Sequence, residues 1–309
     1  MNRLHIVTPQ ADAIASAMRG RTDAFEIVAA PSFAALGDTV AQIEALVAFP
    51  FHLDPALAAR MPRLRWLQVL TAGVDALTGI DLHGAVVSTV SGIHGPQMSE
   101  HAFMLLLALR RDLPLLLDQQ KARVWQAPRP PLLAGSRLLI VGVGQIAEAV
   151  ARRAQAFDMH VTGVSGSRRE APGFDRIVPT SDLIEAAATA DHLIVLTPYS
   201  ERTHHLISRA VIAALPPHAV LINIARGAVV DEAALTEALA HRRIAGAGLD
   251  VFEREPLPAG SALWGLPNVI VTPHMGGWSN AFATQVAPIV ATNATRWFAG
   301  RRPLVNELG

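Results

Sequence analysis

Short apolar runs rich in β-branched residues alternate with helical stretches along almost the whole chain, and this alternation constrains the fold more than any other feature. Runs of four or five such residues, bounded by proline, glycine or aspartate, are typical of parallel strands buried on both faces. In the first part of the chain we predict strands at His5–Thr8, Glu26–Ala29, Ala45–Phe49, Trp66–Leu70 and Val86–Val90. In the second part we predict them at Leu138–Val141, Val161–Val164, Leu193–Leu196, Val220–Ile224, Gly246–Leu249 and Val269–Val271. Two such series predict two doubly wound parallel sheets, with ligands at the carboxyl ends of the strands.

Helical patterns fill the intervals between these strands. The first is an apolar helix from about Pro96 to Arg111, and a proline- and arginine-rich bridge at Ala127–Pro131 follows it. We predict further helices at Ile146–Phe157, Leu183–Ala190, Arg209–Leu215, Glu232–His241 and Ser279–Phe298. The change of series places one domain at residues 1–97 plus 279–309 and the other at residues 98–278.

The composition excludes several classes of protein. Among the 309 residues 51% are apolar and 17% are charged, which excludes a disordered chain. Basic and acidic residues number 26 each, so the basic surplus of a nucleic-acid or anionic-membrane binder is missing. The longest apolar stretch, Ala102–Leu109, is far too short to cross a membrane. The chain has no cysteine, which fits a reducing compartment, and we expect a cytoplasmic protein without a bound metal.

A buried strand runs directly into a glycine turn and then a helix at Leu138–Ala147. Gly142 permits the tight turn, and Gly144 lets the backbone approach a pyrophosphate that the helix N-terminus attracts. Ala147 takes the place of the third glycine and still allows close packing of helix on strand. A bare match of this kind can be an ordinary glycine turn, but the strand before it and the helix after it predict dinucleotide binding.

The next strand ends in a serine at the place where such folds put an acidic residue for the ribose hydroxyls. Ser165 occupies that place, and Ser167, Arg168 and Arg169 follow. Without a carboxylate to repel it, a 2′-phosphate can be held by hydroxyl and guanidinium groups. The alternative is a solvated turn with two unremarkable arginines. The first interpretation predicts that NADP is preferred and that NAD is possible.

Three polar residues follow predicted strands of the second series, namely Arg226, Glu255 and His274. Taken singly, each has an ordinary structural explanation as an ion pair, a solvated carboxylate or a structural histidine. Together they can act on a carbonyl substrate. His274 can exchange a proton with a hydroxyl, Glu255 can hold the imidazole in one tautomer, and Arg226 can clamp a carboxylate bidentately.

With these residues in view, the sequence resembles the D-isomer-specific 2-hydroxyacid dehydrogenase family over nearly its whole length. The matching stretches are Thr71–Asp75, Ser99–His101, Gly142–Ala147, Leu196–Pro198 with Thr203, Asn223–Gly227, Gly248–Phe252, Glu255–Leu257 and Thr272–His274. The resemblance implies a Rossmann cofactor domain inserted in a flavodoxin-like substrate domain. The arginine-bearing turn and the segment His274–Trp278 are nearest the glyoxylate/hydroxypyruvate reductase branch.

The motifs, the resemblance and the nearness of Trp278 to His274 together predict the site residues, although Ser165 stands where the family usually has an aspartate. The catalytic residues would be Arg226, Glu255 and His274. The cofactor-binding residues would be Gly142, Val143, Gly144, Gln145, Ile146, Ser165, Ser167, Arg168, Arg169, Thr197, Pro198, Thr203, Ile224, Ala225, Arg226, Asp250, His274 and Gly276. The substrate residues would be Thr71, Ala72, Gly73, Arg226, His274 and Trp278, with the Ala72 and Gly73 amides on the substrate carboxylate. Asp250 would contact the nicotinamide carboxamide.

These residues predict the NAD(P)H-dependent reduction of a small 2-oxo acid, of the glyoxylate or hydroxypyruvate kind, to the D-2-hydroxy acid. A dinucleotide-sensing binding protein related to transcriptional corepressors is the alternative. A formate dehydrogenase would have Gln at position 255 instead of Glu255. The family and the apolar helix Ala102–Leu109 further predict a homodimer formed through the cofactor domains, with no nucleic-acid or membrane partner.

Overall fold

The computed structural model describes residues 2–20 and 25–308. The chain divides into two compact units, one made of Met1–Ile93 and Ser279–Gly309 and the other of His94–Trp278. The first boundary therefore lies four residues before the predicted one. The reason is that helix α3 (Gly95–Arg110) already begins at Gly95, so the residues from His94 onward belong to the second unit.

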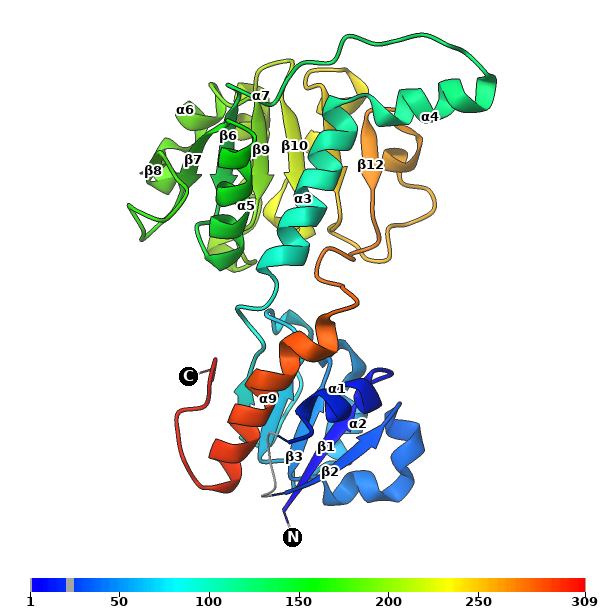
Figure 1. Ribbon diagram of the computed structural model, residues 1–309, viewed down its shortest axis with the longest axis vertical. Helices are drawn as coiled ribbons and strands as arrows, with labels where there is room; N and C mark the ends of the chain where they lie inside the picture. The colour runs from blue at the N-terminus through cyan, green and yellow to red at the C-terminus, as the bar shows by residue number, and fades with distance from the viewer. Residues whose placement is uncertain (1, 21–24, 309) are drawn as a thin grey trace. The chain divides into compact units, whose positions relative to one another are not determined.

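The first unit contains a five-stranded parallel sheet (Figure 1). Its strands are β1 (Arg3–Val7), β2 (Glu26–Ala30), β3 (Ala45–Ala48), β4 (Trp66–Val69) and β5 (Val86–Ser88). They lie in the order β2-β1-β3-β4-β5, which is the flavodoxin-like order. The α-helices of this unit are α1 (Ala11–Met18), α2 (Pro55–Ala59) and α9 (Phe282–Phe298).

The second unit contains a seven-stranded parallel sheet in the order β12-β11-β10-β9-β6-β7-β8. Its strands are β6 (Arg137–Val141), β7 (His160–Val164), β8 (Arg176–Val178), β9 (His192–Val195), β10 (Val220–Asn223), β11 (Gly246–Leu249) and β12 (Val269–Val271). Its helices are α3, α4 (Leu113–Ala122), α5 (Gln145–Ala156), α6 (Leu183–Ala187), α7 (Arg209–Ala214) and α8 (Glu232–Ala240). The order reverses between β6 and β9, as in a Rossmann sheet with one added strand. The predicted fold class is confirmed.

Alternate residues of the central strands enter different cores, because successive side chains of a strand point to opposite faces. On β6, Leu138 and Ile140 join the core under α3 and α5. Leu139 and Val141 join the core under α6, α7 and α8. Helices therefore cover both faces of the second sheet, as Figure 1 shows for α3 and α5. This arrangement leaves the carboxyl ends of the strands as the edge where loops can carry function.

Among the described residues, four α-helices or strands lack a counterpart among the predicted ones, namely α1, α2, α4 and the edge strand β8. Helix α4 leaves the body of the unit, and the chain returns from it as an extended segment to β6 (Figure 1). The apolar residues of α3, which the sequence suggested as a dimer surface, include Ala102, Leu105 and Leu106, and these are fully buried within their own unit. Met104 of α3 is exposed, and a run of further exposed apolar side chains lies just beyond the helix, at Leu113, Leu115, Leu116, Leu117, Val124, Trp125 and Leu132.

Within the described ranges 2–20 and 25–308, none of the helices combines the length and the apolar character that crossing a membrane requires.

Candidate active site

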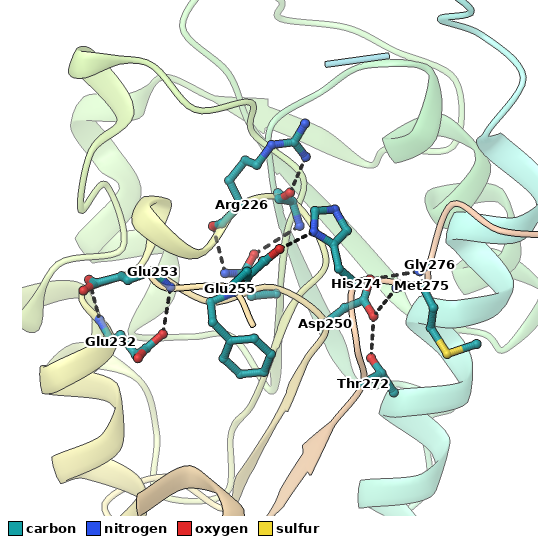
Figure 2. Close-up of polar contacts among 12 residues, drawn as sticks. Arg226, Glu232, Asp250, Glu253, Glu255, Thr272, His274, Met275 and Gly276 are labelled. Atoms are coloured by element: carbon teal, nitrogen blue, oxygen red, sulfur yellow. Dashed lines mark hydrogen bonds and ion pairs between the residues drawn. The ribbon is translucent and has the colours of Figure 1, made fainter. Parts of the chain in front are cut away.

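Three neighbouring strands of the second sheet bring Arg226, Glu255 and His274 to one edge. Arg226 follows β10, Glu255 lies in the loop after β11, and His274 follows β12. These strands are adjacent and parallel, so their carboxyl ends meet at the same edge. Figure 2 shows the three side chains gathered there, with the Glu255 carboxylate directed at the imidazole of His274.

The strongest contact of this group joins His274 to Glu255. His274 Nδ1 lies 2.6 Å from Glu255 Oε2, and the two side chains are 48% and 35% exposed. The other oxygen, Oε1, accepts the backbone N–H of Phe252 at 3.0 Å. Burial alone would raise the pKa of Glu255, but the hydrogen bonds from His274 and Phe252 and the charges of His274 and Arg226 outweigh it and lower the pKa. Glu255 is therefore ionised at neutral pH and ready to stabilise a histidinium.

Arg226 is held at the end of β10 through its backbone. The side chain of Asn223, 2% exposed, donates to the Arg226 carbonyl oxygen at 3.0 Å and accepts from the Ala225 N–H at 3.1 Å. Gly227 follows, and a Cβ there would lie 1.8 Å from the carbonyl carbon of Phe252. Only glycine lets the Arg226 turn come this close to the loop that carries Glu255.

His274 adopts a φ of 51°, a left-handed conformation that is unfavourable for a residue other than glycine. The turn is stabilised by Asp250, whose backbone oxygen accepts the His274 N–H at 2.9 Å. Its carboxylate accepts the N–H groups of Met275 and Gly276, both at 2.9 Å. Thr272 Oγ1 donates to the same carboxylate at 2.5 Å (Figure 2). Asp250 thus holds the chain on both sides of the catalytic candidate.

The Asp250 carboxylate is buried and engaged by its own chain. Burial would raise its pKa, but hydrogen bonds from His101, Thr272 and the two backbone N–H groups overcome this and lower the pKa far below the usual range. The resemblance assigned Asp250 to a nicotinamide carboxamide. With the residue 1% exposed and both oxygens bonded to the turn, the geometry supports a positioning role, and the contact with the carboxamide stays a prediction.

His101 completes this network from helix α3. Its Nε2 lies 3.0 Å from Thr272 Oγ1 and 3.2 Å from Asp250 Oδ1, and its side chain is 6% exposed. Because the Thr272 hydroxyl donates to Asp250, the hydroxyl oxygen is free to accept from a protonated Nε2 of His101. The sequence signalled His101 only as part of a matching motif, and its link to the His274 turn depends on the fold.

The phosphate loop has the geometry that the glycine fingerprint predicts. Gly142 has a φ of 98°, and a Cβ there would lie within 2.8 Å of Thr197 atoms, so glycine is required. Gly144 is the N-cap residue of α5, and a Cβ there would meet no atom within 4 Å. The space next to the N-terminus of α5 is open, and no side chain caps this helix end. A pyrophosphate can approach the backbone N–H groups here, so the residues fit a bound dinucleotide.

At the end of β7, the hydroxyl oxygen of Ser165 accepts the N–H of Arg168 at 3.0 Å and the N–H of Ser167 at 3.3 Å. Arg168 Nη1 donates to Glu148 Oε1 at 2.7 Å. The sequence predicted a turn without a nearby carboxylate, and this contact shows that prediction to be wrong. The carboxylate is missing from the strand end itself, but helix α5 brings one beside the same turn.

The remaining predicted residues lie at the carboxyl ends of strands in both units. Thr197 and Pro198 follow β9, and the Thr203 hydroxyl donates to the Pro198 carbonyl oxygen at 2.9 Å. Thr71, Ala72 and Gly73 follow β4 in the first unit, where Thr71 Oγ1 donates to the Gly73 carbonyl oxygen at 2.6 Å. Trp278 is the last residue of the second unit and is 48% exposed. Ile224, Ala225 and Gly276 lie within two residues of Arg226 or His274 in the chain.

An α/β chain with a phosphate loop, and with Arg, Glu and His at three adjacent strand ends, has the architecture of a nicotinamide-dependent dehydrogenase. Comparison with known proteins agrees. Residues 103–276 match the family model described as D-isomer specific 2-hydroxyacid dehydrogenase, NAD binding domain. The chain is 33% identical to a glyoxylate/hydroxypyruvate reductase B of Pectobacterium carotovorum, and the match covers 93% of each chain.

Two solved structures extend the comparison. A D-isomer specific 2-hydroxyacid dehydrogenase family protein from Aeromonas salmonicida has a TM-score of 0.92 and 35% identity, over 100% of this chain and 99% of the other. An NADPH-dependent glyoxylate/hydroxypyruvate reductase from Sinorhizobium meliloti, in complex with NADP and sulfate, has a TM-score of 0.84 and 27% identity, over 100% and 98%. The protein belongs to the D-isomer specific 2-hydroxyacid dehydrogenase family, whose members are NAD(P)-dependent oxidoreductases.

Proposed function

We propose that this protein reduces a small 2-oxo acid of the glyoxylate or hydroxypyruvate kind to the D-2-hydroxy acid at the expense of NAD(P)H. The observation that carries the proposal is the 2.6 Å contact between His274 Nδ1 and Glu255 Oε2. A carboxylate on one ring nitrogen fixes the tautomer and leaves the other, Nε2, for proton exchange. The names of the relatives support this substrate class.

Each catalytic residue has a separate task in this mechanism. His274 gives its Nε2 proton to the oxygen of the substrate carbonyl as that oxygen gains negative charge. The ionised Glu255 stabilises the histidinium that precedes this transfer. Arg226 binds the substrate carboxylate with two parallel N–H groups and polarises the adjacent carbonyl. When bound, the reduced nicotinamide supplies the hydride.

The Ala72 and Gly73 amides are proposed to bind the substrate carboxylate as well. Within residues 2–20 and 25–308, neither N–H donates a hydrogen bond to the chain itself. Each N–H group is therefore free to donate to an anion.

The cofactor is proposed to be NADPH in preference to NADH. Support comes from Ser165 at the strand end, from Arg168 and Arg169 after it, and from the NADP bound by the Sinorhizobium meliloti relative. A charge-assisted contact to the 2′-phosphate is worth about 1.5–3 kcal/mol, or roughly tenfold to a hundredfold in affinity.

A homodimer is proposed to form through the exposed apolar side chains of α4 and the segment after it. Leu115 and Leu117 are 49% and 46% exposed, and Trp125 is fully exposed. Such a concentration of apolar side chains at a surface is typical of an interface. Light scattering at micromolar protein should give twice the chain mass, and a monomeric mass would contradict the proposal.

The test of the function is a panel of 2-oxo acids assayed with both NADPH and NADH by the loss of nicotinamide absorbance. Glyoxylate and hydroxypyruvate should be turned over, and the His274→Ala variant should bind the cofactor without turnover. A wild-type protein that binds the cofactor but reduces none of the acids would favour a dinucleotide-sensing binding protein.

A further inference from the structure

The carboxylate that is absent from the end of β7 is supplied by helix α5. Glu148 lies in the first turn of α5, and its Oε1 accepts the 2.7 Å hydrogen bond from Arg168 Nη1. The same Nη1 lies 3.4 Å from the carbonyl oxygen of Val143 in the phosphate loop. Arg168 is thereby attached to both elements on which the dinucleotide would lie.

The turn after β7 therefore carries less net positive charge than its two arginines alone suggest. Arg168 is 38% exposed and Glu148 29% exposed, so the pair is neither deeply buried nor fully solvated. Arg169 is exposed, and its Nη1 donates to the carbonyl oxygens of Ser165 and Arg168. One of the two positive charges that were expected to attract a 2′-phosphate is therefore compensated by Glu148.

We propose that Glu148 is a specificity-determining residue that lowers the preference for the 2′-phosphorylated cofactor by pairing with Arg168. This inference rests on the proposed function, because it requires a dinucleotide on the phosphate loop. A 2′-phosphate carries between one and two negative charges near neutral pH. It is attracted by Arg168 and repelled by the Glu148 carboxylate beside it. NADH lacks this phosphate, so the affinity for NADH should depend little on the pair.

The test measures dissociation constants of NADPH and NADH without substrate, by the fluorescence of the reduced nicotinamide. In Glu148→Gln, NADPH should bind roughly tenfold more tightly while NADH changes less than about twofold. Unchanged NADH binding also shows that the domain is folded. Arg168→Ala should weaken NADPH binding about tenfold and leave NADH unchanged.

Glu170→Gln is the matched control, because Glu170 is exposed and lies two residues after Arg168. This substitution removes one negative charge, as Glu148→Gln does. Its NADPH affinity should change less than about threefold. An unchanged ratio of the two affinities in Glu148→Gln, or an equal gain in Glu170→Gln, overturns the inference. Weaker NADPH binding in Glu148→Gln overturns it too, because the pair would then position Arg168 for the phosphate. If neither cofactor binds the wild type, the proposed function itself fails.

Discussion

The turn after β12 and the turn after β7 both follow strands of the same parallel sheet, yet different forces hold them. At the His274 turn, the Asp250 side chain is 2% exposed and bonds to two backbone N–H groups, a hydroxyl and an imidazole. At the Ser165 turn, the principal side-chain contact is the partly exposed pair Arg168–Glu148.

This difference matters because buried and exposed polar contacts respond differently to change. Removing one partner of a buried network leaves the others unsatisfied, at a cost of about 1–3 kcal/mol for each group. A partly exposed ion pair is screened by water and salt and contributes little to stability. We therefore expect changes near His274 to reduce turnover and changes near Ser165 to alter only cofactor choice.

The largest effect is expected at His274 and Arg226. His274→Ala or Arg226→Ala should reduce kcat/KM about a thousandfold or more and leave cofactor affinity nearly intact, because in the proposed mechanism each side chain acts on the transition state. Steady-state kinetics and a cofactor titration of the same samples measure the two quantities. Near-normal turnover of 2-oxo acids by His274→Ala would rule out the mechanism.

The next effect is expected at Asp250, which should act through the turn. Asp250→Asn should lower kcat about ten- to a hundredfold, because an amide cannot accept every hydrogen bond that the carboxylate accepts. The ionised carboxylate stabilises the fold above its ordinary titration range near pH 4, and this stabilisation is lost as the pH falls.

The control for Asp250 is Glu148→Gln, which removes a carboxylate of the other turn. Urea unfolding at pH 7 should show a loss of about 2 kcal/mol for Asp250→Asn and less than about 1 kcal/mol for Glu148→Gln. Equal losses would remove the distinction between the two turns.

A smaller effect is expected for Glu255→Gln. Glu255 is the proposed counter-ion of the protonated imidazole, so without its charge the basic limb of the pH–rate profile for reduction should move to lower pH. The wild-type Glu255, with its lowered pKa, stays ionised across the neutral range. A profile whose basic limb stays in place would mean that Glu255 does not influence the proton transfer.

The smallest effect is expected at Trp278, which lies four residues beyond His274 and is 48% exposed. Trp278→Ala should shift the ranking of 2-oxo acids toward bulkier side chains by severalfold in kcat/KM, because an aromatic wall limits the substrate tail. The substrate panel described above measures the ranking. If it is unchanged, Trp278 does not contact the substrate.

Much of the fold is predictable from the pattern of apolar residues. Strands β6, β9, β10 and β11 are buried on both faces and therefore read as continuous apolar runs. The edge strand β8 has only three residues and one buried side chain, so it carries no such signal. Helix α4 was not predicted either, because none of its residues is buried and its apolar residues follow no core-facing period.

The sequence by itself determined the two strand–helix series, the glycine turn, and the places of Arg226, Glu255 and His274 after three strands. These follow from local rules, since apolar period and turn chemistry act over a few residues. Tertiary structure decided which distant groups meet. His101 reaches Asp250 across 149 positions of the chain, and Glu148 reaches Arg168 across 20. Such pairs depend on how helices pack on the sheet, and no local pattern of residues specifies them.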